Sequence, residues 1–295
     1  MYYRRKVALS LLQVFDNKLD KIQIQKLLFL YSRYKTKKKT YDFVPYKFGC
    51  FSFQANADLY TLIKYGIIKE TSTSWNKIDD TNYLIQLDKE DKKIISDFAI
   101  IYNNKSSDDL IKLTYKNFPY YTINSTIADK YLSSSELKNL ENYKSNENDI
   151  VLFTIGYEGI SLESYLNKLI RNNIKLLCDV RKNALSMKYG FTKSQLDKSC
   201  KGVGIKYIHI PEVGINSDKR QELNSQEDYD KLFTEYVSNN LNKTKNHQED
   251  ILNLLKENRR IALTCFEADK CQCHRTHLAE AISDFNDFNY EIEHL

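Results

Sequence analysis

The spacing of apolar residues divides this chain into two halves of different character. In the first 149 residues, apolar positions recur mainly at the three- and four-residue intervals of amphipathic helices. From Ile150 onward, short continuous apolar runs alternate with helical stretches, a pattern typical of strands buried on both faces of a parallel sheet. The polar stretch Tyr143–Asp149 lies between the two patterns. We therefore expect the domain boundary there.

The C-terminal half predicts strands and helices in alternation. Strands are expected at 150–155, 174–180, 205–210, 260–266 and 290–294, and helices at 161–171, 192–200, 228–239, 247–258 and 273–285. This order implies right-handed crossovers and a mostly parallel sheet. Residues 150–295 are therefore expected to form a Rossmann-like α/β layer sandwich. Neither a Gly-x-Gly-x-x-Gly nor a P-loop string occurs in them, so the sequence gives no support for a nicotinamide or nucleotide cofactor.

The first 88 residues predict three helices followed by a β-hairpin, which is the order of a winged helix. The hairpin is expected from Ile67–Glu70 and Tyr83–Leu87, on either side of a polar stretch. The string Pro45–Ser52 resembles the Lys-Tyr-Gly-Pro turn of bacterial winged-helix-like and antitoxin-type modules, although Cys50 stands where Pro is expected. A helical dimerisation or docking domain is the alternative. Residues 89–149 predict a helical connector, with Ser133 capping one of its helices.

Charge strengthens the nucleic-acid interpretation of the first segment. The whole chain carries a formal charge of +5, but residues 1–69 contain 14 basic and 4 acidic residues. Such asymmetry is expected of a module that binds a phosphate backbone, although a run of lysines is often only an exposed face. The residues expected to contact DNA are Arg33, Lys35, Lys37, Lys38, Lys39 and Lys47.

Three polar strings follow predicted strands of the second half. They are Gly156–Gly159, Asp179–Arg181, and Cys265–Glu267 together with Cys273–Arg275. Because the carboxyl ends of parallel strands meet at one edge of a sheet, we expect them to form one cleft. From Thr154 on, these strings resemble the signature of the DUF488 family, a domain of unknown function. That family has a Pro shortly before Cys-His-Arg, whereas this chain has a second cysteine, Cys271, and lacks the Pro.

The residue types in the predicted cleft suggest roles for its side chains. Glu158, Asp179, Tyr157 and Glu267 are expected to be catalytic, and Gly156, Gly159, Arg181, Glu212, His274 and Arg275 to bind substrate. Glycine turns allow close approach of a ligand, carboxylates can activate water, and arginine can hold a phosphate. An ordinary turn at Gly156–Gly159 and a structural ion pair between Asp179 and Arg181 are the alternatives.

The cysteines allow three interpretations. Cys273 at a helix N-terminus could be an activated nucleophile, but the extended Cys-x5-Arg loop of cysteine phosphatases is absent. Cys265, Cys271, Cys273, His274 and His277 could ligate zinc, although the Cys271-x-Cys273 spacing is tighter than usual. A packed, reduced thiol is the third interpretation and the one favoured. Neither a metal nor a cofactor is therefore expected.

The predicted cleft contains several carboxylates, the aromatic ring of Tyr157 and two arginines. This combination is suited to the cleavage of glycosidic bonds. Beside a basic DNA-binding module, they predict a glycosylase that excises a modified or damaged base from double-stranded DNA, in defence against foreign DNA. A metal-dependent nuclease or phosphodiesterase is the enzymatic alternative. A winged-helix regulator whose α/β domain senses a ligand is the non-enzymatic one. The apolar runs are too short to cross a bilayer and no signal peptide is evident, so a soluble cytoplasmic protein without a membrane partner is expected.

Overall fold

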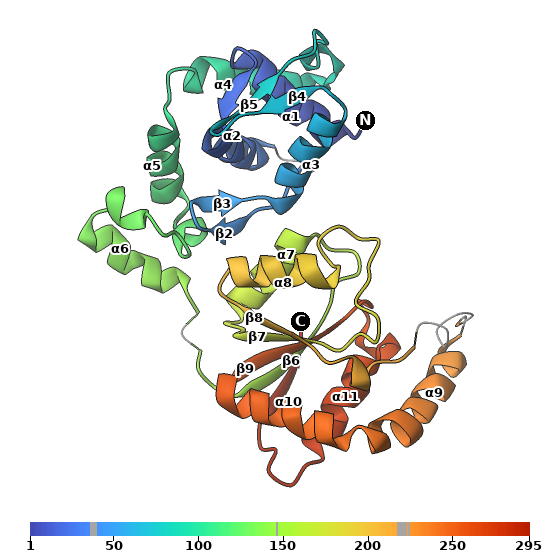
Figure 1. Ribbon diagram of the computed structural model, residues 1–295. Coiled ribbons are helices and arrows are strands. Elements are labelled where there is room, and N and C mark those ends of the chain that lie inside the picture. Colours follow the sequence, from blue (N-terminus) through green and yellow to red (C-terminus); the bar gives the residue numbers. More distant parts are fainter. Residues whose placement is uncertain (36–39, 146, 217–222, 224) are drawn as a thin grey trace. The chain divides into compact units, whose positions relative to one another are not determined.

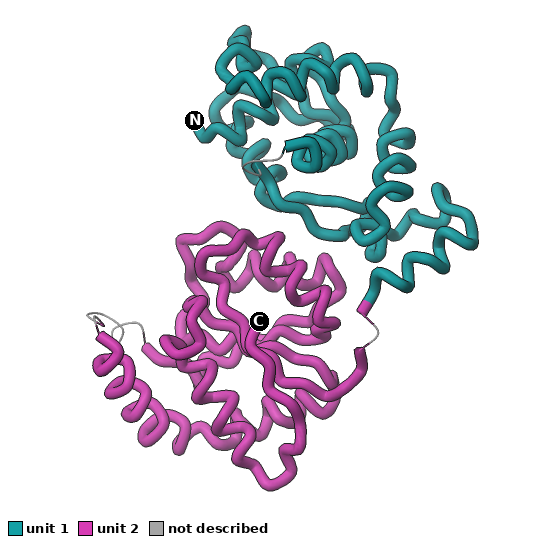
Figure 2. Tube along the Cα trace, turned by 180° about the vertical axis from the view of Figure 1, so that it is seen from behind, with its two compact units in different colours: residues 1–144 teal, residues 145–295 magenta. Residues whose placement is uncertain are grey.

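The computed structural model divides the chain into two compact units, residues 1–144 (unit 1) and 145–295 (unit 2), which Figure 2 shows in different colours. The structure describes residues 1–35, 40–145, 147–216, 223 and 225–295. None of the described helices is long and apolar enough to span a membrane. Most of the expected connector, residues 89–149, belongs to unit 1.

Unit 1 begins with the helix and strand order of a winged helix. Its elements are α1 (Tyr3–Val14), β1 (Lys18–Asp20), α2 (Lys21–Tyr34), β2 (Val44–Tyr46), β3 (Gly49–Phe51), α3 (Phe53–Lys64), β4 (Ile68–Glu70), β5 (Ser74–Lys77), α4 (Lys89–Tyr102), α5 (Ser107–Asn117) and α6 (Ser134–Leu140). Strands β1, β5 and β4 form one antiparallel sheet, and β2 and β3 form a separate hairpin. The expected cap of α6 is confirmed, since the Ser133 hydroxyl accepts a hydrogen bond from the Glu136 amide.

The wing differs from the prediction in its second strand. This strand is β5, within the stretch expected to be a polar turn, whereas Leu84–Gln86 form a turn of 3-10 helix. Two factors explain the difference. Trp75 in β5 is buried and packs edge-on against Tyr60 of α3, and the backbone of Tyr83 donates to the side chain of Gln13 in α1. Contacts with the helices, and not the apolar content of each segment, therefore determine which segment forms the strand.

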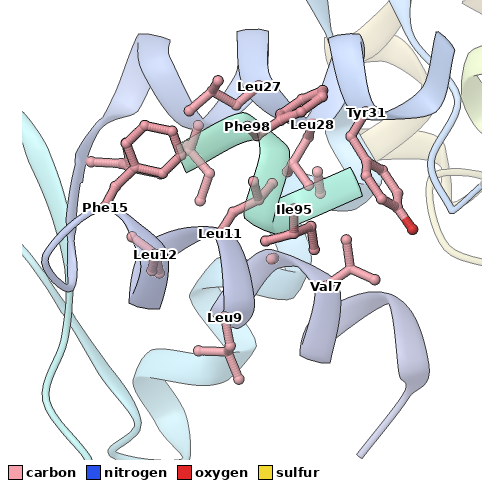
Figure 3. Packing of buried hydrophobic residues seen from close by; sticks show 14 of the residues in the cluster. Val7, Leu9, Leu11, Leu12, Phe15, Leu27, Leu28, Tyr31, Ile95 and Phe98 are labelled. Carbon is pink, nitrogen blue, oxygen red and sulfur yellow. The ribbon is translucent and has the colours of Figure 1, made fainter. Parts of the chain in front are cut away.

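The core of unit 1 lies where α1, α2 and α4 meet (Figure 3). Leu11 and Leu12 of α1 face Leu27 of α2 and Ile95 of α4 in this cluster, and all of them are buried. The apolar positions that predicted amphipathic helices are therefore the positions that pack.

A buried carboxylate links these three helices. Asp91 of α4 accepts hydrogen bonds from the Tyr3 hydroxyl at 2.7 Å, from the Tyr31 hydroxyl, and from the Lys35 ammonium at 2.5 Å. Burial alone would raise the pKa of Asp91, but the hydrogen bonds from Lys35, Tyr31 and Tyr3 outweigh burial and hold it below its usual value. Asp91 thus stabilises unit 1 only while it is ionised.

Replacing Asp91 by Asn is expected to lower the free energy of unfolding of unit 1 at pH 7 by about 2 kcal/mol, because the charged acceptor of three donors is lost. A lowered pKa in the folded state gives stability that is present above the unfolded pKa of about 3.9 and is lost as the pH falls through the folded pKa. The difference between wild type and Asp91→Asn should therefore shrink towards pH 3. Urea unfolding followed by the fluorescence of Trp75, the only tryptophan, measures it. An equal difference at pH 7 and pH 3 would contradict this account.

Unit 2 is the predicted layer sandwich around a parallel sheet. Its elements are β6 (Val151–Gly156), α7 (Leu162–Arg171), β7 (Leu176–Asp179), α8 (Lys193–Gly202), β8 (Lys206–His209), α9 (Gln226–Glu235), α10 (Lys245–Asn258), β9 (Arg260–Cys265), α11 (His274–Ser283) and β10 (Glu291–His294). The strand order is β10-β6-β9-β7-β8, and all four pairings are parallel. Helices α7 and α8 cover one face of the sheet, and α10 and α11 cover the other (Figure 1). The α/β fold expected from the sequence is confirmed.

Parallel pairing brings the three polar strings together. Gly156 at the end of β6 pairs with Cys265 at the end of β9, and Asp179 at the end of β7 pairs with Thr264 of β9. The segments after β6, β7 and β9 therefore leave the sheet at the same edge, where a site can form.

Candidate active site

A pocket of about 410 Å³ opens at this edge of the sheet. The described residues that line it are Tyr157, Arg181, Lys182, Asn183, Leu185, Ser186, Met187, Ile215, Cys265, Phe266, Glu267 and His274. Its size falls within the range of small-molecule sites. Four of the residues expected to be catalytic or to bind substrate are among these lining residues, namely Tyr157, Arg181, Glu267 and His274.

Tyr157 forms one wall of the pocket and is itself almost fully buried. Its ring stacks on Phe191, with centroids 4.2 Å apart and planes at 10°, and its hydroxyl accepts a hydrogen bond from Arg181 at 2.7 Å. Burial raises the pKa of Tyr157 above its usual value although Arg181 acts in the opposite direction, so the phenol is neutral at physiological pH. Tyr157 is thus a fixed wall rather than a proton acceptor.

Asp179 does not reach the pocket, because it is committed to a buried ion pair. It is fully buried and binds Arg181 through both oxygens, with Nε–Oδ1 at 2.8 Å and Nη2–Oδ2 at 2.5 Å. The Tyr207 hydroxyl donates to Oδ2 at 2.7 Å. The geometry gives Asp179 a positioning role, in which it orients the guanidinium that borders the pocket.

Glu158 and Glu212, two further expected carboxylates, also lie outside the described lining of the pocket. Both are exposed. The Glu158 carboxylate accepts a hydrogen bond from the amide of Ala268 at 3.0 Å, so it holds the loop that follows β9. Only the main chain of Glu212 has a described hydrogen bond, from the Asn240 side chain to its carbonyl.

Two residues of the strings hold the backbone at the base of the site. The guanidinium of Arg275 is buried and donates to the carbonyls of Glu267 at 2.6 Å and Ala268 at 3.1 Å. A Cβ on Gly156 would lie 1.8 Å from the Glu267 carbonyl oxygen. Glycine is therefore required at 156 for close packing of β6 against the loop after β9, whereas Gly159 has a left-handed φ of +75° and open space around it.

Glu267 lies among sulfur and imidazole groups. The Cys265 thiol donates to its Oε2 at 3.1 Å and lies 3.6 Å from Nδ1 of His274. The Nε2 of His274 is 3.0 Å from the carbonyl oxygen of Val180. Because a carbonyl only accepts, Nε2 carries the proton and Nδ1 presents its lone pair to the sulfur. Burial, then the neighbouring Cys265, raise the pKa of Cys273 well above its usual value, so the helix N-terminus does not produce an activated thiolate.

The sequence did not reveal one side of the pocket. The loop after β7 supplies Lys182, Ser186 and two apolar side chains, Leu185 and Met187, that are exposed. Exposed Phe266 lies on the β9 side. A loop without periodicity gives no signal of its own, and only its position after a strand end could have marked it.

Some basic residues of unit 1 form ion pairs with buried aspartates of the same unit. Arg4 and Arg5 bind buried Asp58 at 2.5 and 2.7 Å, and Lys35, expected to contact DNA, is the buried partner of Asp91. The excess of basic residues therefore overstates the positive charge presented to solvent.

The remaining DNA-contact candidates have different surroundings. Arg33 lies over the rings of Phe29 and Tyr121 and donates to the Tyr121 hydroxyl. Lys47 is exposed between β2 and β3. Lys37, Lys38 and Lys39 lie outside the described residues.

Comparison with known proteins found a family match for unit 2 and none for unit 1. No curated protein and no solved structure matches the chain. The match that was found begins just after the Gly156–Gly159 string and ends within α11. Residues 161–282 match the family model of DUF488, a domain of unknown function, which is the family that the C-terminal half resembles.

Proposed function

We propose that unit 2 hydrolyses the N-glycosidic bond of a modified or damaged nucleotide in DNA. The observation that carries this proposal is the position of Glu267, which bears the only carboxylate among the described residues lining the pocket. A carboxylate beside a partly apolar pocket can stabilise an oxocarbenium-like sugar or accept a proton from the attacking water. With Asp179 neutralised by Arg181, this role falls to Glu267 alone.

The side chains around the opening of the pocket are suited to binding a planar, partly apolar substrate. Phe266, Leu185 and Met187 expose apolar surface around the opening, and a flipped base could stack on Phe266. Lys182 lies in the same lining and supplies a positive charge for a flanking phosphate. Unit 1 would contribute affinity for the duplex, with exposed Lys47 among its contacts.

The test compares Glu267, on the loop after β9, with Glu158, on the loop after β6. Purified protein is incubated with duplexes that carry deaminated, alkylated, oxidised or hypermodified bases, and released bases and abasic sites are quantified. We expect Glu267→Gln to reduce base release at least about 100-fold, in the range found for acid–base groups. Glu158→Gln should stay within about threefold of wild type, because Glu158 lies outside the described lining and glutamine keeps an oxygen that can accept the hydrogen bond from the Ala268 amide.

Three outcomes would overturn the proposal. Strand scission that leaves no abasic site and stops on chelation would favour the nuclease. Sequence-specific binding to DNA without turnover would favour the regulator. Equal loss of base release in Glu158→Gln and Glu267→Gln would remove the catalytic role of Glu267.

A further inference from the structure

A cluster of two thiols and one imidazole lies at the base of the pocket. Cys265 ends β9, Cys273 immediately precedes α11, and His274 is its first residue. Their sulfur and nitrogen atoms all lie within 4.8 Å of one another, and all three residues are buried. The loop after β9 thus folds back to bring together groups that are eight and nine positions apart.

The imidazole is oriented as a metal ligand. Its Nε2–H faces the Val180 carbonyl at 3.0 Å, which directs the Nδ1 lone pair to the Cys265 thiol. Histidines that bind metals commonly hold the other ring nitrogen in this way, with a backbone carbonyl as partner. The nitrogen that is free to bind a metal is therefore the one that faces sulfur.

The spacing also fits a tetrahedral ion. Zn–S bonds of about 2.3 Å and Zn–N bonds of about 2.0–2.1 Å, at a tetrahedral angle, place sulfur and nitrogen about 3.6 Å apart. The distance from Cys265 Sγ to His274 Nδ1 is 3.6 Å.

We propose that Cys265, Cys273 and His274 bind one zinc ion, with a fourth position open to the pocket. Two thiolates and an imidazole are soft and borderline ligands that favour zinc over magnesium. Because the pocket reaches Cys265, Glu267 and His274, a water or substrate atom would enter the fourth position from there. Three protein ligands and an open position are typical of catalytic rather than structural zinc.

This proposal differs from the expectation drawn from the sequence, in which no metal was predicted. Two candidate ligands are excluded from the cluster. Cys271 is exposed, and His277 lies 3.2 Å from the Glu280 carboxylate. The tight Cys271-x-Cys273 spacing, which argued against zinc, is therefore irrelevant, since the second thiol comes from β9.

The test measures metal binding directly, without an activity assay. The full chain is purified under reducing conditions, loaded with zinc, dialysed, and analysed for metal content. Replacement of zinc by Co²⁺ is then followed by absorption. We expect about one zinc per chain and, with Co²⁺, thiolate charge-transfer bands together with the visible bands of a tetrahedral site. These wild-type measurements do not depend on whether any variant folds.

Variants assign the ligands. Cys265→Ser and Cys273→Ser should each weaken zinc binding more than about tenfold, whereas Cys271→Ser, the matched control in the same loop, should bind as wild type does. Wild-type protein that holds less than about 0.1 zinc per chain, or a Co²⁺ spectrum without thiolate bands, would overturn the site. So would an equal loss of binding in Cys271→Ser. Because no substrate is involved, these results stand whether or not the protein releases a base.

Discussion

Replacing Asp179 by Asn is expected to lower the free energy of unfolding of unit 2 by about 3–5 kcal/mol. The substitution leaves Arg181 buried without its counter-ion, and an uncompensated buried charge costs far more than an exposed pair contributes. It also removes an acceptor of the Tyr207 hydroxyl. We therefore expect a large effect on stability in addition to any effect on the pocket.

The single tryptophan makes this prediction specific to one unit. Trp75 belongs to unit 1, so its fluorescence follows the unfolding of unit 1. The far-UV circular dichroism of the whole chain also reports unit 2, and in Asp179→Asn we expect part of that signal to be lost at lower urea concentration than in wild type. Glu227→Gln is the control, because its pair with Lys231 is exposed and should contribute less than about 1 kcal/mol. An Asp179→Asn protein as stable as Glu227→Gln would show that the pair does not hold the site together.

Gly156→Ala is expected to cost unit 2 at least about 3 kcal/mol, at the upper end of overpacking effects. The new methyl group would meet the Glu267 carbonyl, a backbone group that cannot rotate away and that also accepts a hydrogen bond from Arg275. Relief requires the loop after β9 to move, and Glu267 would move with it. The same substitution should therefore reduce any activity that depends on Glu267.

Gly159→Ala, three residues later, is the matched control. A Cβ there meets nothing within 4 Å, and only the left-handed backbone conformation disfavours alanine, by about 1–2 kcal/mol. The two variants are compared by urea unfolding followed by circular dichroism. Equal losses would mean that backbone conformation, and not the close approach of the loop, explains both glycines.

The sequence predicted the architecture of unit 2 well because its central strands are buried on both faces, and such strands consist of continuous apolar residues. The same property located the site, since polar residues after such runs must meet at one edge of the sheet. It predicted unit 1 less well. There, the more apolar segment, residues 84–86, was expected to form the strand, whereas the strand is β5, a largely polar segment in which Trp75 packs against α3.

Individual roles could not be predicted from the sequence. The sequence shows three carboxylates after predicted strands, Asp179, Glu158 and Glu267, and does not distinguish their roles. In the structure, Arg181 neutralises the first, and the second accepts a hydrogen bond from the Ala268 amide, 110 positions away. Only the third faces the pocket. Likewise, the thiol that accompanies Cys273 could not be chosen by spacing, because Cys265 reaches it through the turn of the chain after β9.

The position of β9 has a consequence for the order in which the protein forms during synthesis. Strands β6 and β7 are made early but do not pair with each other, because β9, made about a hundred residues after β6, lies between them. All residues of unit 1 are available once residue 144 has left the ribosome. In unit 2, by contrast, the edges of β6 and β7 that face β9 stay unpaired until residues 260–265 emerge. Such non-local pairing is slow, and the unpaired strand edges are prone to aggregation while they are exposed. The nascent chain should therefore depend on chaperones mainly between the synthesis of β7 and β9, and the loop after β9 and His274 are the last parts of the described pocket lining to be synthesised.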